Sequence, residues 1–150
     1  MIIYIDMDDV MCDFSEAHKK ALDHNPGVKY PQGIEGFFLK LSPIHGAIDS
    51  VELLRQNFDV YILTAPSTRN PHCYSEKRIW IEDHFGYEFT KKLIISPNKG
   101  LLRGDILIDD HIDGKGQEEF EGDLIHFGST SFPDWSSVME HLTELTSRYT

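Results

Sequence analysis

The chain has 150 residues, of which 40% are hydrophobic and 26% are charged, and its formal net charge is −11. This size and composition suit a single globular domain with a sizeable buried core. The acidic balance argues against a surface that binds polymeric nucleic acid, because phosphate backbones are held by clusters of Lys and Arg. The acidic balance does not exclude a small phosphorylated substrate, because a bound divalent cation reverses the local electrostatic field.

Other bulk features narrow the cellular setting. The two cysteines, Cys12 and Cys73, form neither a disulfide framework nor a metal-ligand spacing. No apolar run approaches the roughly 18 residues of a membrane span, and Met1 leads straight into an apolar run without a signal peptide. We therefore expect a protein with no membrane partner, cytoplasmic by default, and leave open whether it forms a homodimer.

The first fourteen residues, MIIYIDMDDVMCDF, carry the strongest signal. The apolar run Ile2–Ile5 predicts a buried parallel strand, and Asp6, Asp8 and Asp9 follow it with no basic residue among them. The carboxyl ends of parallel strands are where α/β proteins place their chemistry. Carboxylates crowded there repel one another unless a cation joins them, and Mg²⁺ prefers such oxygen ligands. Taken alone, the stretch fits a solvated acidic turn equally well.

The rest of the chain alternates between predicted helices and strands. Helical spacing predicts helices over residues 14 to about 24, 44–57, 75–85 and 135–147. Ser15 is the candidate N-cap of the first, and Leu53 and Ile79 are placed on inward faces. Apolar runs predict strands at 59–64, 92–96, 105–108 and 124–128, whereas the polar run 117–121 is expected to be solvated. This alternation predicts an α/β fold with a parallel sheet of five strands.

Polar residues follow several of the predicted strands. Thr64 ends the second, Asp109 and Asp110 end the fourth, and Lys99 follows the third by a few residues. Each has an ordinary explanation alone, as a strand residue, a turn or a solvated surface lysine. Because the carboxyl ends of parallel strands share one edge of a sheet, all of them can converge with Asp6. The joint pattern favours one functional site.

These segments resemble the four motifs of the haloacid dehalogenase superfamily of phosphotransferases, and most closely its 5′(3′)-deoxyribonucleotidase branch. The resemblance is carried by DMDDVMCDF, LTAP, CYSEKRIWIEDHFG and NKGLLRGDILIDDHID, with PIHGAIDSVELL before the second strand. It covers about residues 1–14 and 41–128. It implies a three-layer Rossmann-like fold in one domain spanning residues 1–150, with a small cap insertion at about residues 15–43.

The resemblance also implies a Mg²⁺-dependent phosphomonoesterase. Asp6 would attack phosphorus and form an aspartyl-phosphate, and Asp8 would act first as general acid and then as general base. Thr64 would donate hydrogen bonds to the transferring phosphoryl group, and Lys99 would neutralise its charge. The implied metal ligands are the Asp6 carboxylate, the Asp8 carbonyl and the Asp110 carboxylate, with Asp109 orienting them or exchanging roles with Asp110.

Substrate contacts are expected from the cap and from the segment after the second strand. Phe14 and Phe38 are candidates to stack on a nucleobase, or else to pack the cap onto the core. Ala65 stands where relatives often carry a serine, and Lys77 is a candidate phosphate contact, unless it is an inert surface cation. The expected substrate is a deoxynucleoside monophosphate. The alternatives are another small phosphorylated metabolite and a non-catalytic phosphate-binding domain.

Overall fold

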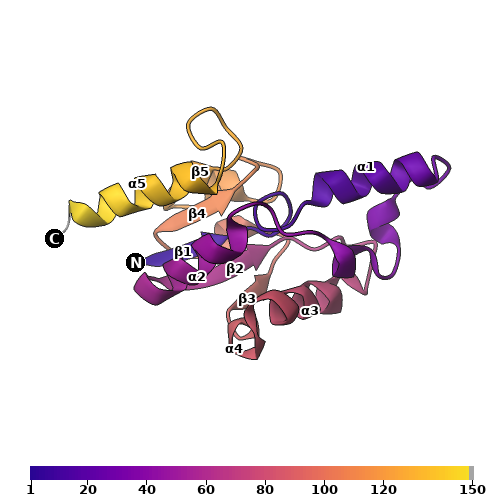
Figure 1. Cartoon of the computed structure of the whole chain (residues 1–150), viewed down its shortest axis with the longest axis horizontal. Helices are drawn as coiled ribbons and strands as arrows, with labels where there is room; N and C mark the ends of the chain where they lie inside the picture. Colours follow the sequence, from indigo (N-terminus) through magenta and orange to yellow (C-terminus); the bar gives the residue numbers. More distant parts are fainter. Residues whose placement is uncertain (149–150) are drawn as a thin grey trace.

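The computed structural model describes residues 1–148 and contains one five-stranded sheet in the order β3-β2-β1-β4-β5. Its strands are β1 (Ile2–Ile5), β2 (Asp59–Thr64), β3 (Leu93–Ile95), β4 (Ile106–Asp109) and β5 (Asp123–His126), and all pairs are parallel. The predicted α/β class and parallel sheet are confirmed. Ile5 is paired with Ile62 and Ile108, so the carboxyl ends of β2, β1 and β4 lie side by side (Figure 1).

Five α-helices and four short 3₁₀ turns join these strands within the described residues. They are α1 (Phe14–His24), α2 (Ala47–Asn57), α3 (Cys73–Phe85), α4 (Tyr87–Thr90), α5 (Trp135–Ser147), η1 (Pro31–Gly33), η2 (Phe37–Lys40), η3 (Lys99–Leu101) and η4 (Gln117–Glu119). The helix predicted from residue 44 begins only at Ala47, because Gly46 adopts a left-handed φ of 80°. The short helix α4 was not predicted. None of the helices in residues 1–148 is long and apolar enough to cross a bilayer.

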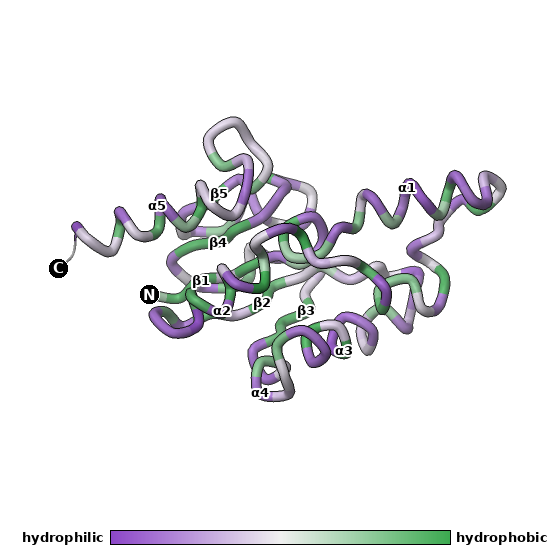
Figure 2. Tube along the Cα trace, in the orientation of Figure 1, coloured by the Kyte–Doolittle hydropathy of each residue, from purple (hydrophilic) through white to green (hydrophobic). Residues whose placement is uncertain are grey.

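The two faces of the sheet are covered differently. Ile5, Ile62 and Ile108 belong to the larger core, which α2, α3 and α5 complete on one face. On the other face Tyr4 and Leu107 pack in a smaller cluster, where the crossovers carry η3 and η4 instead of long helices. Figure 2 shows the strands as largely hydrophobic segments at the centre of the molecule. This double burial explains why the strands read as continuous apolar runs.

Three sequence-based expectations about helices are wrong. Leu53 and Ile79, placed on inward faces, are 50% and 37% exposed, because neighbouring residues on α2 and α3 form the buried faces instead. The N-cap of α1 is Asp13 rather than Ser15, and its carboxylate accepts the backbone N–H of Glu16 at 3.0 Å. A capping residue must precede the first turn, whereas Ser15 already lies within it.

The insertion after β1, residues 14–46, is fixed to the body by α3. The carboxylate of Glu76 accepts backbone N–H groups from Gly36 at 3.0 Å and Phe38 at 3.1 Å. The indole Nε1 of Trp80 donates to the carbonyl of Leu41 at 2.8 Å. In contrast, α1 has no buried residue, projects from the body and is mostly hydrophilic (Figures 1 and 2). The inner part of the insertion is therefore held rigidly beside the sheet edge, while α1 extends outward.

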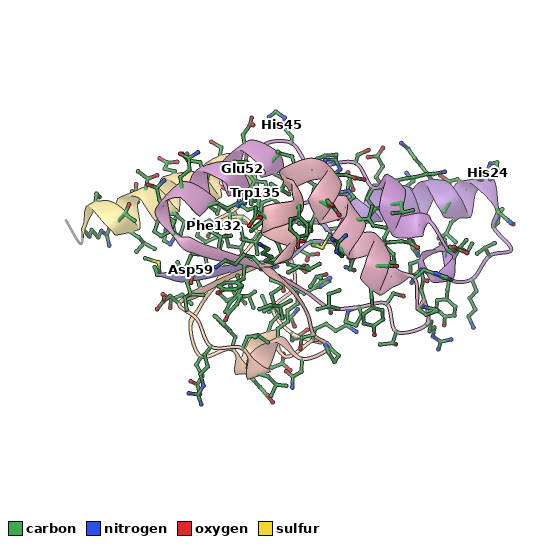
Figure 3. All side chains as sticks on the ribbon, turned by 90° about the horizontal axis from the view of Figure 1, so that it is seen from below. His24, His45, Glu52, Asp59, Phe132 and Trp135 are labelled. Atoms are coloured by element: carbon green, nitrogen blue, oxygen red, sulfur yellow. The ribbon has the colours of Figure 1, made fainter. Side chains whose placement is uncertain are left out.

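The loop between β1 and α1 is equally constrained. The carbonyl of Met7 accepts backbone N–H groups from three residues, Val10, Met11 and Cys12. Trp135 donates its indole N–H to the Val10 carbonyl at 2.8 Å. In Figure 3, Trp135 lies among the central side chains, whereas His24 and His45 lie at the edge of the molecule. The first turn of α5 therefore supports the loop that carries the N-terminal aspartates.

Candidate active site

Three neighbouring strands present predicted site residues at one edge of the sheet. Asp6 follows β1, Thr64 ends β2 and Asp109 ends β4. The ammonium of Lys99, from η3, lies 2.9 Å from Asp6 Oδ1 and 2.5 Å from Asp109 Oδ2. One cation therefore joins two carboxylates that come from adjacent strands, as the positions of these residues in the sequence predicted.

Lys99 is a buried residue, with only 2% of its surface exposed. Its backbone N–H donates to the Lys115 carbonyl at 2.7 Å, which fixes the start of η3. Asp109 is also fully buried, and accepts further hydrogen bonds from the backbone of His111 at 2.9 Å and from Gln117 Nε2 at 3.3 Å. Gln117 was expected to be solvated but is 3% exposed. It lies among acidic residues, and nothing in this local sequence indicates that its side chain is buried.

Burial and crowding shift the acidity of these groups. Burial raises the pKa of Asp6 well above its usual value; Lys99 lowers it in part, while Asp109 and Asp110 raise it further. Burial also raises the pKa of Asp110 to about 6. Burial opposes the charge on Lys99, but the adjacent Asp6 and Asp109 carboxylates outweigh it and raise the pKa of this ammonium. The site therefore holds more negative charge than Lys99 alone compensates.

A cluster of carboxylates next to Lys99 has the composition of a site for a hard cation. Asp6, Asp109 and Asp110 each offer one oxygen, and these oxygens lie within 4.8 Å of one another. Asp110 Oδ1 is buried and has no hydrogen-bond partner in residues 1–148. An orphaned buried carboxylate oxygen is costly unless a ligand binds it. A divalent metal ion would meet this requirement.

Lys77 differs most from its expected environment. The sequence predicts either a phosphate contact or an inert surface cation, but Lys77 is 0% exposed, and its ammonium lies 3.0 Å from Asp8 Oδ2 and 2.6 Å from Thr64 Oγ1. Burial opposes its charge, but the neighbouring acidic groups, Asp8 foremost among them, together outweigh burial and raise the pKa of Lys77. Thr64 is itself 1% exposed, so both groups lie below the surface of the site. Lys77 therefore contacts the predicted acid–base residue rather than solvent.

A cleft of about 620 Å³ opens in front of these residues. Its floor includes Asp6, Asp8 and Lys99, and its walls come from the insertion and from the segment after β2, including the predicted Phe14, Phe38 and Ala65 and the unpredicted Tyr30 and Gln32. Phe38 is only 2% exposed, and the ammonium of Lys77 lies 5.1 Å from its ring centroid. Phe38 therefore serves mainly in packing, whereas the partly exposed Phe14 remains available to a ligand.

Asp9 occupies an unusual backbone conformation in the rim of the cleft. Its φ of 62° makes it the one non-glycine residue with positive φ in the described chain. Its carboxylate accepts the backbone N–H of Ser15 at 2.8 Å and the hydroxyl of Ser15 at 2.6 Å. Aspartate tolerates this conformation better than most residues, and these hydrogen bonds tie the loop to the first turn of α1.

Comparisons with known proteins agree with this geometry. Residues 28–132 match the family described as 5′ nucleotidase, deoxy (pyrimidine), cytosolic type C protein. A candidate 5′(3′)-deoxyribonucleotidase of Vibrio phage KVP40 is 40% identical over 144 residues, which cover 95% of this chain and 84% of the relative. The human cytosolic 5′(3′)-deoxyribonucleotidase is 43% identical over 86 residues, which cover 56% of this chain and 43% of that protein.

The extent of these matches differs between relatives. The human mitochondrial 5′(3′)-deoxyribonucleotidase is 36% identical over 86 residues, which cover 38% of its length, so the chain spans less than half of either human relative. The match to the phage protein and to the family extends over most of this chain. The chain therefore belongs to the family described as 5′ nucleotidase, deoxy (pyrimidine), cytosolic type C protein, within the haloacid dehalogenase superfamily.

Proposed function

We propose that the chain is a Mg²⁺-dependent phosphomonoesterase that dephosphorylates deoxynucleoside monophosphates through an aspartyl-phosphate. The observation that carries this proposal is the Asp6 carboxylate, which is fixed by Lys99 at 2.9 Å on the floor of an open cleft and clustered with two further carboxylates. The relatives named 5′(3′)-deoxyribonucleotidase support the substrate class.

The proposed reaction uses two aspartates, Asp6 and Asp8. Asp6 attacks phosphorus, the bond from phosphorus to the ester oxygen breaks, and Asp8 donates a proton to the departing alkoxide. Water then attacks the aspartyl-phosphate while Asp8 accepts its proton, and inorganic phosphate and free Asp6 are released. Lys99 offsets negative charge at Asp6, and Lys77 holds the carboxylate of Asp8 at 3.0 Å.

The carboxylates of Asp6 and Asp110 and the backbone carbonyl of Asp8 would hold Mg²⁺. The unpartnered oxygen of Asp110 favours it as a direct ligand, because the oxygens of Asp109 already accept hydrogen bonds from Lys99, His111 and Gln117. Asp109 would instead orient its neighbours. When bound, the ion neutralises and orients the phosphoryl group.

The preference for a deoxyribose would arise at the wall of the cleft. Phe14 lines the cleft and packs against Phe37 and Phe38, with ring centroids 5.5 Å and 6.1 Å away. An apolar ring beside the sugar would leave a ribose 2′-hydroxyl desolvated and unpaired. We expect dUMP to be preferred over UMP by about tenfold or more in kcat/KM.

The test is phosphate release from a panel of phosphate monoesters with Mg²⁺, using wild type, Asp6→Asn and the control Asp123→Asn. Asp123 is exposed at the start of β5, on the opposite edge from the site, so its variant should retain wild-type activity. An amide cannot form the phosphoenzyme, so Asp6→Asn should retain less than about a hundredth of the activity. Greater retention would refute the covalent route. A wild type that hydrolyses no ester would favour a non-catalytic domain, and one active only on other esters would favour another metabolite.

A further inference from the structure

One side-chain amide in the wall of the cleft has an unmet hydrogen-bonding requirement. Gln32, in η1, lines the same cleft as Asp6 and Lys99. Its Oε1 is buried and has no hydrogen-bond partner in residues 1–148. The second side-chain atom of this kind in the described chain is Asp110 Oδ1, in the carboxylate cluster. Buried polar atoms without partners are rare, because their lost hydration costs free energy. Each of these two atoms is therefore a candidate contact for a ligand.

The backbone around Gln32 is held in place from the body of the protein. Asn70, which is 0% exposed, donates its side-chain amide to the carbonyls of Gln32 at 3.0 Å and Ile34 at 3.3 Å. The backbone N–H of Asn70 donates to the Ser67 carbonyl at 3.0 Å, and Ser67 lines the same cleft. Gln32 is therefore presented by two joined segments, so little ordering is needed when a ligand binds.

The chemistry of the amide defines what it can bind. A glutamine side chain places one acceptor next to two N–H donors. Its complement is an N–H group adjacent to a carbonyl, which is the arrangement on a nucleobase edge. Uracil and thymine fit best because carbonyls flank their ring N–H on both sides, so the glutamine donor finds an acceptor in either orientation. Near Gln32 the wall also carries Tyr30, whose ring lies 4.7 Å from the Arg69 guanidinium, and the ring of Phe14.

We propose that Gln32 is a specificity-determining residue that binds the imide edge of a uracil or thymine base through paired hydrogen bonds. The proposal rests on the proposed function, since it assigns the base contact of the same phosphomonoester substrate. The phosphate would lie over Asp6 at the floor, and the base would extend along the insertion toward Gln32. Base discrimination then depends on this amide as well as on stacking, which tolerates every base.

The test compares kcat/KM for dUMP, N3-methyl-dUMP and deoxyribose 5-phosphate in wild type, Gln32→Leu and the control Gln56→Leu. Gln56 is exposed on α2, so its variant should match wild type. Wild type should prefer dUMP over N3-methyl-dUMP by at least about tenfold, because methylation removes the N–H donor. Gln32→Leu should lose this preference and most of its activity on dUMP, but should hydrolyse deoxyribose 5-phosphate within about twofold of wild type.

The outcomes separate this inference from the proposed function. If wild type hydrolyses none of the three esters, both the proposed function and the assignment of Gln32 are wrong. If wild type hydrolyses dUMP and N3-methyl-dUMP equally, or if Gln32→Leu loses all substrates in parallel, the assignment of Gln32 is wrong while the phosphatase stands. The comparison of dUMP with N3-methyl-dUMP uses the wild-type protein. It therefore tests the assignment of Gln32 even if the Gln32→Leu variant folds poorly.

Discussion

Replacing Lys77 with methionine would test how the acid–base residue is held. Lys77 is completely buried, and its ammonium lies 3.0 Å from Asp8 Oδ2 and 2.6 Å from Thr64 Oγ1. Methionine has nearly the same length and fills the same volume, so Lys77→Met removes the charge and the two hydrogen bonds with little change in packing. We expect a modest loss of stability and a much larger loss of activity.

The expected magnitudes follow from the exposure of the partners. Both hydrogen bonds have the charged ammonium as donor, and a hydrogen bond of this kind contributes about 1.5–3 kcal/mol. Two effects oppose this loss: the buried ammonium no longer needs desolvation, and the Asp8 side chain, 27% exposed, can recover water. We expect a net destabilisation of about 1–3 kcal/mol, or a Tm lower by roughly 2–12 °C. A displaced Asp8 should lower kcat by about 100-fold, because general acid–base catalysis depends on position.

The assay pairs steady-state kinetics on dUMP with thermal unfolding. Lys92→Met is the matched control, because Lys92 also bonds a carboxylate and a hydroxyl, Asp59 at 2.8 Å and Tyr61 at 3.3 Å, but its side chain is 40% exposed. Exposed pairs contribute about 0–1 kcal/mol, so this variant should keep its Tm and its activity. The KM for dUMP should change little in Lys77→Met, since the ammonium does not line the cleft.

Two results would refute this reasoning. A Lys77→Met variant with at least half of the wild-type kcat would show that Asp8 needs no buried cation to hold it. A large rise in KM at unchanged kcat would show instead that Lys77 contacts the substrate, which is one of the two expectations from sequence alone.

Two further predictions concern the carboxylate cluster. Asp110→Ala should weaken Mg²⁺ binding, measured by calorimetry, at least about tenfold more than Asp109→Ala, because of these two residues it is Asp110 that has an unpartnered buried oxygen; the reverse order would exchange their roles. In metal-free protein the pKa of Asp110 is raised to about 6, so the folded chain binds this proton more tightly than the unfolded chain does. The Tm should therefore rise as the pH falls from about 7 to about 5, and saturating Mg²⁺ should remove this rise; a Tm that falls over the same interval without metal would contradict the assignment.

Local sequence was sufficient for the sheet and for the residues at its edge. Apolar runs such as Ile2–Ile5 and Ile106–Ile108 identify strands that are buried on both faces, and the polar residue after each run marks the carboxyl end. Because parallel strands share that edge, the sequence is sufficient to place Asp6, Lys99 and Asp109 in one site. The order of elements in the chain carries this information.

The tertiary structure alone decided which polar side chains are buried and what they contact. Lys77 is 69 residues from Asp8 in sequence, and Gln117, which donates to Asp109, lies in a segment without a regular hydrophobic pattern. A lysine or glutamine in the sequence is most often a surface residue, and no local pattern reveals a buried partner on another segment. Such a residue becomes buried only where the fold supplies an opposite charge or a hydrogen-bond partner to offset its desolvation, and for Lys77 that partner is the carboxylate of Asp8.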